Sequence, residues 1–276
     1  MPNTSLRCLP RAEELNSLTT SALRESFLVE HLFEPGELNL VPTDLDRLAV
    51  GAAMPIGELR LPSCREFGTS FFTERRELGI INIGAPGVVR VGAQPYPLEP
   101  LDCLYVGIGE PDIVFESATD APPAFYFLSC PAHQKHPTTK VTRSDAQSAT
   151  IGSAATASCR RLNKYIHPGG VQSCQLVMGF TELEPGSVWN TMPAHTHTRR
   201  SEIYLYFDLG DQMVVHLFGK PENTRHLIVR DRQAILAPPW SLHSGAGTAN
   251  YRFIWGMAGE NQSFDDMDPI PMASLL

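Results

Sequence analysis

The sequence predicts an all-β protein of two jelly-roll halves with little helix. The chain has 276 residues with 23 Pro and 21 Gly, and these turn-forming residues separate short apolar runs rich in β-branched and aromatic side chains. Such runs are typical of antiparallel strands, and many short strands favour a sandwich or barrel. In chain order the runs are 80–83, 88–91, 104–108, 113–115, 176–180, 203–207, 213–218, 226–229 and 251–257. One helix is expected, over about residues 11–27, where helix formers recur with a weak helical period.

The chain divides into two related halves. Residues 132–158 are rich in Ser, Thr and Ala, so we interpret them as a surface connection. On either side, residues 74–81 and residues 198–205 each contain a basic pair, then an acid, then an apolar strand. This weak internal repeat predicts a duplication, with an N-terminal half over residues 1–140 and a C-terminal half over residues 141–276.

Charge and composition restrict the partners and the compartment. The formal net charge of -8 disfavours a general affinity for nucleic acid or for an anionic membrane. No stretch reaches the roughly 20 apolar residues that span a bilayer, and residues 1–23 lack the apolar region of a signal peptide. The six cysteines are scattered without a CxxC pair. We therefore expect a cytoplasmic protein with reduced thiols.

The strongest chemical signal is a metal-ligand set in the C-terminal half. Residues i and i+2 of a strand point to the same face, so His195 and His197 can reach one ion. Glu202 follows a short polar turn, and His243 stands in a Pro-rich segment before the strand expected at 251–257. An HxH pair alone often arises by chance, but three imidazoles with one carboxylate suit zinc, iron, manganese, nickel or cobalt.

The N-terminal half lacks these ligands. If Glu77 corresponds to Glu202, then Ser70 and Phe72 stand where the two histidines would be. We therefore expect a metal-free N-terminal half that serves packing and assembly, and one metal ion per chain.

The order of the four ligands resembles the two motifs of the cupin superfamily, G-x5-HxH-x3,4-E-x6-G and P-x-G-x2-H. Gly186 precedes the histidine pair and Gly210 follows Glu202, each at a slightly longer spacing than in the motif. Pro238 and His243 match the second motif, with Trp240 in place of its glycine. The resemblance implies a bicupin, and the departures concern the loops rather than the ligand types.

Longer runs resemble one family more specifically, the 5-dehydro-4-deoxy-D-glucuronate isomerases, also called 4-deoxy-L-threo-5-hexosulose-uronate ketol-isomerases. The resemblance extends from about residue 23 to residue 267, and its clearest runs are 74–87, 189–197, 255–262 and 264–268. It implies conversion of 4-deoxy-L-threo-5-hexosulose uronate to 3-deoxy-D-glycero-2,5-hexodiulosonate in the breakdown of pectin-derived uronates. It also implies a hexamer and one zinc ion per subunit, with the family's ligands carried over onto His195, His197, Glu202 and His243.

A uronate substrate needs a cation for its carboxylate. Arg199, Arg200 and Lys164 are the candidates, because guanidinium groups bind carboxylates in a bidentate manner. The two arginines could instead form a solvated turn or an ion pair between subunits.

The catalytic acid or base is not identified by the sequence. Tyr204 and Tyr206 share strand parity with Glu202, so they could line a pocket or pack in the core, and Trp255 and Met257 leave the same choice open. A Tyr hydroxyl such as that of Tyr204, an acid from residues 260–268, or a metal-bound water could transfer the proton.

Three other functions are compatible with the sequence. A related cupin isomerase acts on 5-deoxyglucuronate in inositol breakdown, and many bicupins are metal-dependent dioxygenases. A non-catalytic sugar-binding cupin is the third. The runs quoted above favour the uronate isomerase, and retention of all four ligands argues against a purely binding protein. No GxGxxG motif suggests a nicotinamide or flavin site.

Overall fold

A computed structural model describes residues 5–276, which form two compact units. Unit 1 contains residues 31–147 and 165–177 with the N-terminal segment up to Arg7, and unit 2 contains residues 8–30, 148–164 and 178–276. This partition differs from a single cut between residues 140 and 141. Residues 8–30 belong to unit 2, where β1 (Leu28–Val29) pairs with β19 (Gln233–Ala237). Residues 165–177 belong to unit 1 because their backbone is bound there, as described below.

Unit 1 has two antiparallel sheets. The six-stranded sheet has the order β11-β8-β5-β10-β3-β2 and the four-stranded sheet the order β4-β9-β6-β7. Their bounds are β2 (Leu38–Pro42), β3 (Ala49–Ala53), β4 (Glu58–Arg60), β5 (Arg76–Asn82), β6 (Gly87–Val91), β7 (Gln94–Leu98), β8 (Cys103–Val106), β9 (Ile113–Ser117), β10 (Phe125–Pro131) and β11 (Thr139–Val141), with short 3-10 turns at Phe72–Glu74 and Arg143–Asp145.

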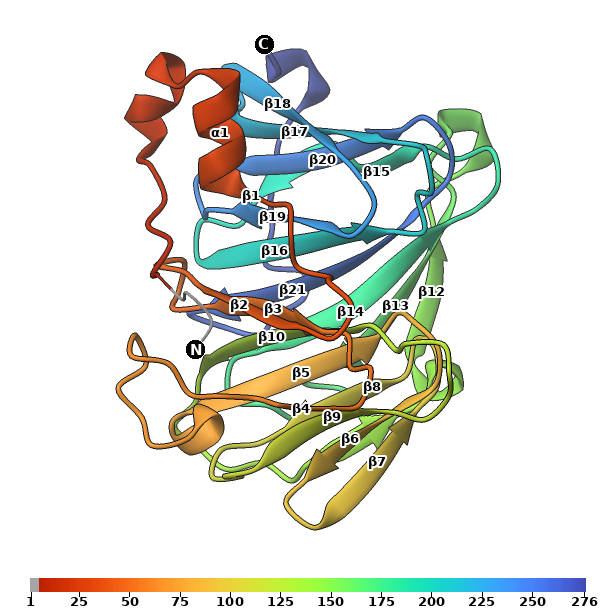
Figure 1. Ribbon diagram of the computed structural model, residues 1–276. Coiled ribbons are helices and arrows are strands. Elements are labelled where there is room, and N and C mark those ends of the chain that lie inside the picture. Colours follow the sequence, from red (N-terminus) through yellow and green to blue (C-terminus); the bar gives the residue numbers. More distant parts are fainter. Residues whose placement is uncertain (1–4) are drawn as a thin grey trace. The chain divides into compact units, whose positions relative to one another are not determined.

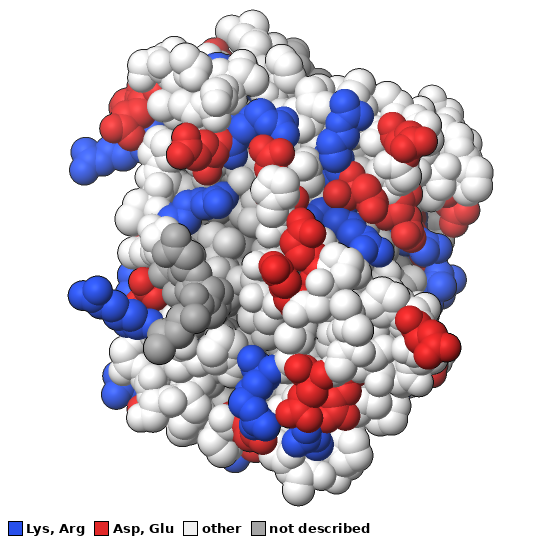
Figure 2. Space-filling view, in the orientation of Figure 1, with Lys and Arg blue, Asp and Glu red and all other residues white. Residues whose placement is uncertain are grey.

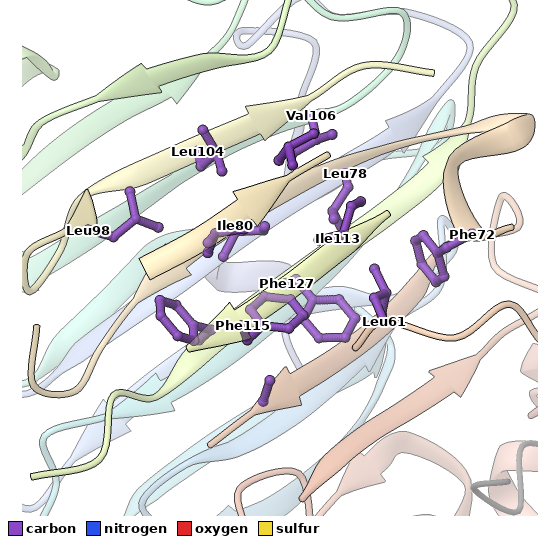
Figure 3. Packing of buried hydrophobic residues seen from close by; sticks show 14 of the residues in the cluster. Leu61, Phe72, Leu78, Ile80, Leu98, Leu104, Val106, Ile113, Phe115 and Phe127 are labelled. Carbon is purple, nitrogen blue, oxygen red and sulfur yellow. The ribbon is translucent and has the colours of Figure 1, made fainter. Parts of the chain in front are cut away.

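The core of unit 1 lies between these two sheets. Alternate residues of β5, Leu78 and Ile80, are fully buried in it, as strand alternation requires. Phe115 of β9 stacks on Phe127 of β10 with ring centroids 5.8 Å apart, and Figure 3 shows these side chains packed together. Apolar side chains therefore fill the interior of this unit.

Unit 2 also contains two sheets, and α1 packs on it (Figure 1). The seven-stranded sheet has the order β1-β19-β16-β21-β14-β13-β12 and the five-stranded sheet the order β18-β17-β20-β15-β22. The remaining bounds are α1 (Thr20–Phe27), β12 (Gln147–Ile151), β13 (Arg160–Ile166), β14 (Val177–Leu183), β15 (Trp189–Thr196), β16 (Arg200–Phe207), β17 (Val214–Lys220), β18 (Asn223–Val229), β20 (Leu242–Gly247), β21 (Arg252–Gly259) and β22 (Asp268–Pro269), with 3-10 turns at Ala12–Ser17, Ala154–Thr156 and Met272–Ser274.

The secondary structure agrees with most of the sequence predictions. Each of the nine apolar runs overlaps a strand. The helix expected over residues 11–27 is two short helices, and Thr19 caps α1 by accepting a hydrogen bond from the backbone N–H of Ala22. The prediction for residues 132–158 was incomplete, because this stretch contains β11 and β12. All five residues of β12 are exposed at the sheet edge, so the strand shows no apolar alternation.

Basic and acidic side chains are interspersed on the face shown in Figure 2, with neither sign forming a continuous patch there. None of the helices in residues 5–276 has the length and apolar character needed to cross a membrane.

Candidate metal centre

The four ligands expected from the sequence converge in unit 2. His195 on β15 is the direct cross-strand partner of His243 on β20, and His197 follows β15 immediately. Glu202 comes from β16 of the other sheet, so the group lies where both sheets of the unit contribute. One ligand atom from each residue lies within 4.8 Å of all the others. Across residues 5–276 this is the one group of three or more His, Cys, Asp or Glu side chains arranged so that it could hold a metal ion.

His243 was placed differently by the sequence interpretation. The sequence suggested a turn leading into the strand at 251–257, whereas His243 lies on a separate strand, β20, between β15 and β17. The Pro-rich residues just before it end β19 and begin this additional strand. His243 is still part of the candidate site, but it reaches that site by cross-strand pairing rather than from a loop.

The spacing of the ligand atoms suits a shared cation. His195 Nε2 lies 3.0 Å from His197 Nε2 and 3.1 Å from His243 Nε2. Glu202 Oε2 lies 3.1 Å from His197 Nε2 and 3.0 Å from His243 Nε2. Ligands about 2.0–2.1 Å from one ion stand at about this separation from each other. The buried Oε2 atom has no hydrogen-bond partner of good geometry, so a cation would satisfy it.

The protonation of these groups also fits metal binding. Burial lowers the pKa of His195 to about 2, with His243 and His197 adding to the effect, so its imidazole is neutral. Burial alone would raise the pKa of Glu202, but His243 and His197 outweigh it and hold the pKa below its usual range. A neutral imidazole at His195 and an ionised carboxylate at Glu202 are the forms in which these side chains bind divalent metals.

The ring of His197 also has contacts outside the group of four candidate ligands. His197 Nδ1 lies 3.0 Å from the backbone carbonyl of Asp266, and Arg200 Nη2 donates to the same carbonyl at 2.7 Å. If His197 donates its Nδ1–H to this oxygen, the Nε2 lone pair points at the other three ligands. Such contacts fix the tautomer and ring orientation of metal-binding histidines.

A cavity of about 260 Å³ opens onto the cluster. This volume is below the roughly 300–1,000 Å³ of sites for drug-sized ligands, so it suits a small molecule. Most of the wall is apolar or aromatic, including Met192, Phe253, Trp255, Met257 and Phe264. The expectation that Trp255 and Met257 could be pocket walls thus agrees with the structure.

The two tyrosines of β16 occupy different places. Tyr204 lines the cavity, and Thr191 and Glu202 are hydrogen-bonding neighbours of its hydroxyl. Burial and the nearby Glu202 raise the pKa of Tyr204 well above its usual value, so the hydroxyl stays protonated. Tyr206 does not line the cavity, and its hydroxyl instead lies 2.8 Å from Nδ1 of the fully buried His216. The sequence did not indicate this role for His216.

None of the three cations chosen from the sequence lines the cavity. Arg199 is bound to Asp266, with Nε 2.8 Å from Oδ1, and to Asp268 at 3.1 Å. Arg200 is fully buried and bound to the Asp266 carbonyl. Lys164 lies over the ring of Phe264, with Nζ 4.9 Å from the centroid.

The cavity contains a different cation, Arg160 at the start of β13, which the sequence interpretation missed. The sequence signal that could have identified Arg160 was the alternation of residues along the strand. Arg160 and Leu162 alternate with the exposed Arg161, so an arginine occupies an apolar-facing position of a strand.

In unit 1, the carboxylate of Glu77 binds the backbone of residues 174–176. Its Oε1 accepts hydrogen bonds from the backbone N–H groups of Gln175 and Leu176, both at 2.7 Å. Its Oε2 accepts from Cys174 N at 2.7 Å and from the Tyr105 hydroxyl at 2.8 Å. This carboxylate, which the internal repeat aligns with Glu202, thereby fixes the segment that joins unit 1 from beyond residue 164.

A sequence model of the KduI/IolB family matches residues 27–270 of this chain. The chain belongs to the KduI/IolB family. Curated relatives named 4-deoxy-L-threo-5-hexosulose-uronate ketol-isomerase support the assignment. The relative from Opitutus terrae is 57% identical over 268 residues, covering 96% of this chain and 97% of its own. The relative from Caldicellulosiruptor bescii is 50% identical over 265 residues, covering 95% and 96%.

Solved structures of proteins with much lower sequence identity share the fold. An IolB-like protein from Salmonella typhimurium matches with a TM-score of 0.72 at 13% identity, over 88% of this chain and 96% of that one. An oxalate decarboxylase from Lactobacillus farciminis matches with a TM-score of 0.55 at 8% identity, over 78% of both chains. The all-β bicupin predicted from the sequence is confirmed, as is the family that the sequence resembled.

Proposed function

We propose that the protein is an aldose–ketose isomerase that converts 4-deoxy-L-threo-5-hexosulose uronate to 3-deoxy-D-glycero-2,5-hexodiulosonate in pectin and uronate catabolism. The observation that carries the proposal is the convergence of three imidazoles and one carboxylate on a small cavity, in a chain whose nearly full-length relatives bear the ketol-isomerase name. Substrate and product are isomers, so the reaction needs no external oxidant or reductant.

His195, His197, Glu202 and His243 would hold one divalent metal ion, and zinc is the ion that the family resemblance implies. When bound, the ion supplies Lewis acidity that polarises a carbonyl and stabilises negative charge on substrate oxygens. The N-terminal half is proposed to be metal-free, since Phe72 packs into the apolar core and the carboxylate of Glu77 accepts hydrogen bonds from backbone N–H groups.

The side chains of the cavity would do the rest of the chemistry. Isomerisation removes hydrogen from C2 and adds it at C1, while a hydroxyl proton moves from O2 to O1. The protonated hydroxyl of Tyr204 lies beside Glu202 in the cavity, where it can give or receive a proton at a substrate oxygen. Trp255 and Phe253 give the cavity an apolar wall beside the reacting groups.

The proposed compartment is the cytoplasm. All six cysteines are free, which suits the reducing cytoplasm. A closed homo-oligomer, with a hexamer implied by the family resemblance, is proposed for the working protein. Sedimentation of the purified protein would measure it.

The reaction itself can be followed by NMR. Purified protein supplied with metal and the hexosulose uronate should convert the aldehyde signal into that of the 2,5-diketone, with no added nicotinamide or flavin. An untouched uronate, together with conversion of 5-deoxyglucuronate or consumption of oxygen, would replace the proposal by one of the two rival enzymes. If the uronate, 5-deoxyglucuronate and oxygen all remain unconverted, a sugar-binding protein would be favoured.

Tyr204→Phe is expected to lower kcat by about 100-fold or more, because general acid–base groups contribute at least that much. Tyr206→Phe is the matched control. It lies on the same strand and face, but it binds His216 and does not line the cavity, so its kcat should stay within a few-fold of the original. Equal losses in the two variants would exclude a specific role for Tyr204.

A further inference from the structure

Arg160 is the one lysine or arginine among the cavity-lining residues of the described chain. It stands at the first position of β13, on the same strand face as the cavity-lining Leu162. The other charged or titratable groups that line the cavity, apart from Tyr204, are the ligands His195, His197 and Glu202. The cavity therefore has one cationic side chain outside the metal centre.

The guanidinium of Arg160 is largely uncommitted. Its Nη1 donates to the backbone carbonyl of Ser158 at 2.7 Å, and within residues 5–276 it pairs with no carboxylate. Arg199, by contrast, is held by Asp266 and Asp268. Burial lowers the pKa of Arg160, which reflects the cost of keeping this charge partly out of water without an anion.

The proposed substrate has the complementary charge pattern. Its carboxylate and its aldehyde stand at opposite ends of a six-carbon chain. The cavity offers a cation, a metal-ligand cluster and an apolar wall to such a molecule. A planar guanidinium with free N–H groups can bind a carboxylate through two hydrogen bonds.

We propose that Arg160 binds the carboxylate of the uronate and so orients the aldehyde end toward His195, His197, Glu202 and His243. This inference rests on the proposed function and adds the residue that makes the site specific for acidic sugars. It replaces Arg199, Arg200 and Lys164, the anchors expected from the sequence, because none of these lines the cavity.

The test compares the uronate with its methyl ester, which lacks the negative charge. Arg160→Gln should raise KM for the acid by at least about tenfold, since a desolvated ion pair to a ligand is worth more than the 1.4 kcal/mol of a tenfold change. The preference for acid over ester, measured as the ratio of kcat/KM values, should fall at least about tenfold in the same variant.

Arg161→Gln is the matched control, because it removes the same charge from the next residue of β13, whose side chain is exposed. Its acid preference should equal that of the unchanged protein, and metal content should be the same in both variants. Arg160→Lys keeps a cation and should retain part of the preference, which gives a second reading if Arg160→Gln folds poorly.

An unchanged acid preference in a folded Arg160→Gln variant would overturn the assignment. An Arg160→Lys variant whose ratio of acid to ester turnover equals that of Arg161→Gln would also overturn it. Failure of the proposed function is distinguishable from both, because the unchanged protein would then fail to isomerise the acid at all.

Discussion

Glu202→Gln should abolish isomerase activity while the chain stays folded. The substitution keeps the size of the side chain but removes the anionic ligand that stands within 3.1 Å of both His197 and His243. Loss of a direct ligand should cost more than the 10- to 100-fold of an outer contact, so kcat/KM is expected to fall about 1,000-fold or more. His243→Ala should act in the same way.

Metal analysis and thermal melting accompany this measurement. Bound metal should fall well below one equivalent, while Tm stays within a few degrees when the variant is compared with metal-free original protein, because the two units have their own apolar interiors. Glu222→Gln makes the same change at an exposed position and should leave turnover and metal unaffected. Full turnover with normal metal content in Glu202→Gln would show that the cluster is not the active centre.

Glu77→Ala should produce the largest loss of stability. The carboxylate accepts three backbone N–H groups, from residues 174–176, and the hydroxyl of Tyr105. Each buried donor left without an acceptor costs about 1–3 kcal/mol. We expect the free energy of unfolding to fall by about 3–5 kcal/mol, with water entry limiting the total.

Urea denaturation followed by circular dichroism measures this change. Tyr105→Phe removes a single one of these hydrogen bonds and should cost about 1 kcal/mol. Glu77→Gln retains one acceptor oxygen, so its loss should lie between the two. A loss below 1 kcal/mol for Glu77→Ala would contradict a structural role for this carboxylate.

The convergence of the four candidate ligands was predictable because their signals are local. His195 and His197 share a strand face by simple alternation, and Glu202 follows one short turn later. His243 lies far along the chain, but the Pro-rich segment before it and its place in the motif order marked it. The strand carrying it was not predicted, because residues 242–247 (Leu-His-Ser-Gly-Ala-Gly) contain few of the large apolar residues that signal a strand.

The residues around the ligands depend on contacts that the sequence does not show. Arg199 and Arg200 adjoin the ligands in sequence, yet Asp266 and Asp268, more than sixty residues later, draw Arg199 away from the cavity. Arg160 reaches the cavity because β13 lies in the same sheet as β16, which is about forty residues later in the chain, with β14 and β21 between them. Parity alone could have marked it, but only once the strand itself was known.

The boundary between the two units could not be predicted from the sequence, because it also depends on contacts between distant residues. Residues 165–177 join unit 1 through Glu77, almost one hundred residues earlier in the chain. A change of composition indicates where a chain becomes polar, but it does not show which carboxylate will bind a distant backbone.

Metal titration of the stripped protein tests the central claim most directly. After chelation, zinc is added in known amounts, and both bound metal and the initial rate of uronate isomerisation are measured. The proposed site predicts no activity without metal and a rate that rises linearly and then levels off at one ion per chain. Full isomerase activity in metal-free protein, or a rate that requires two ions per chain, would contradict it.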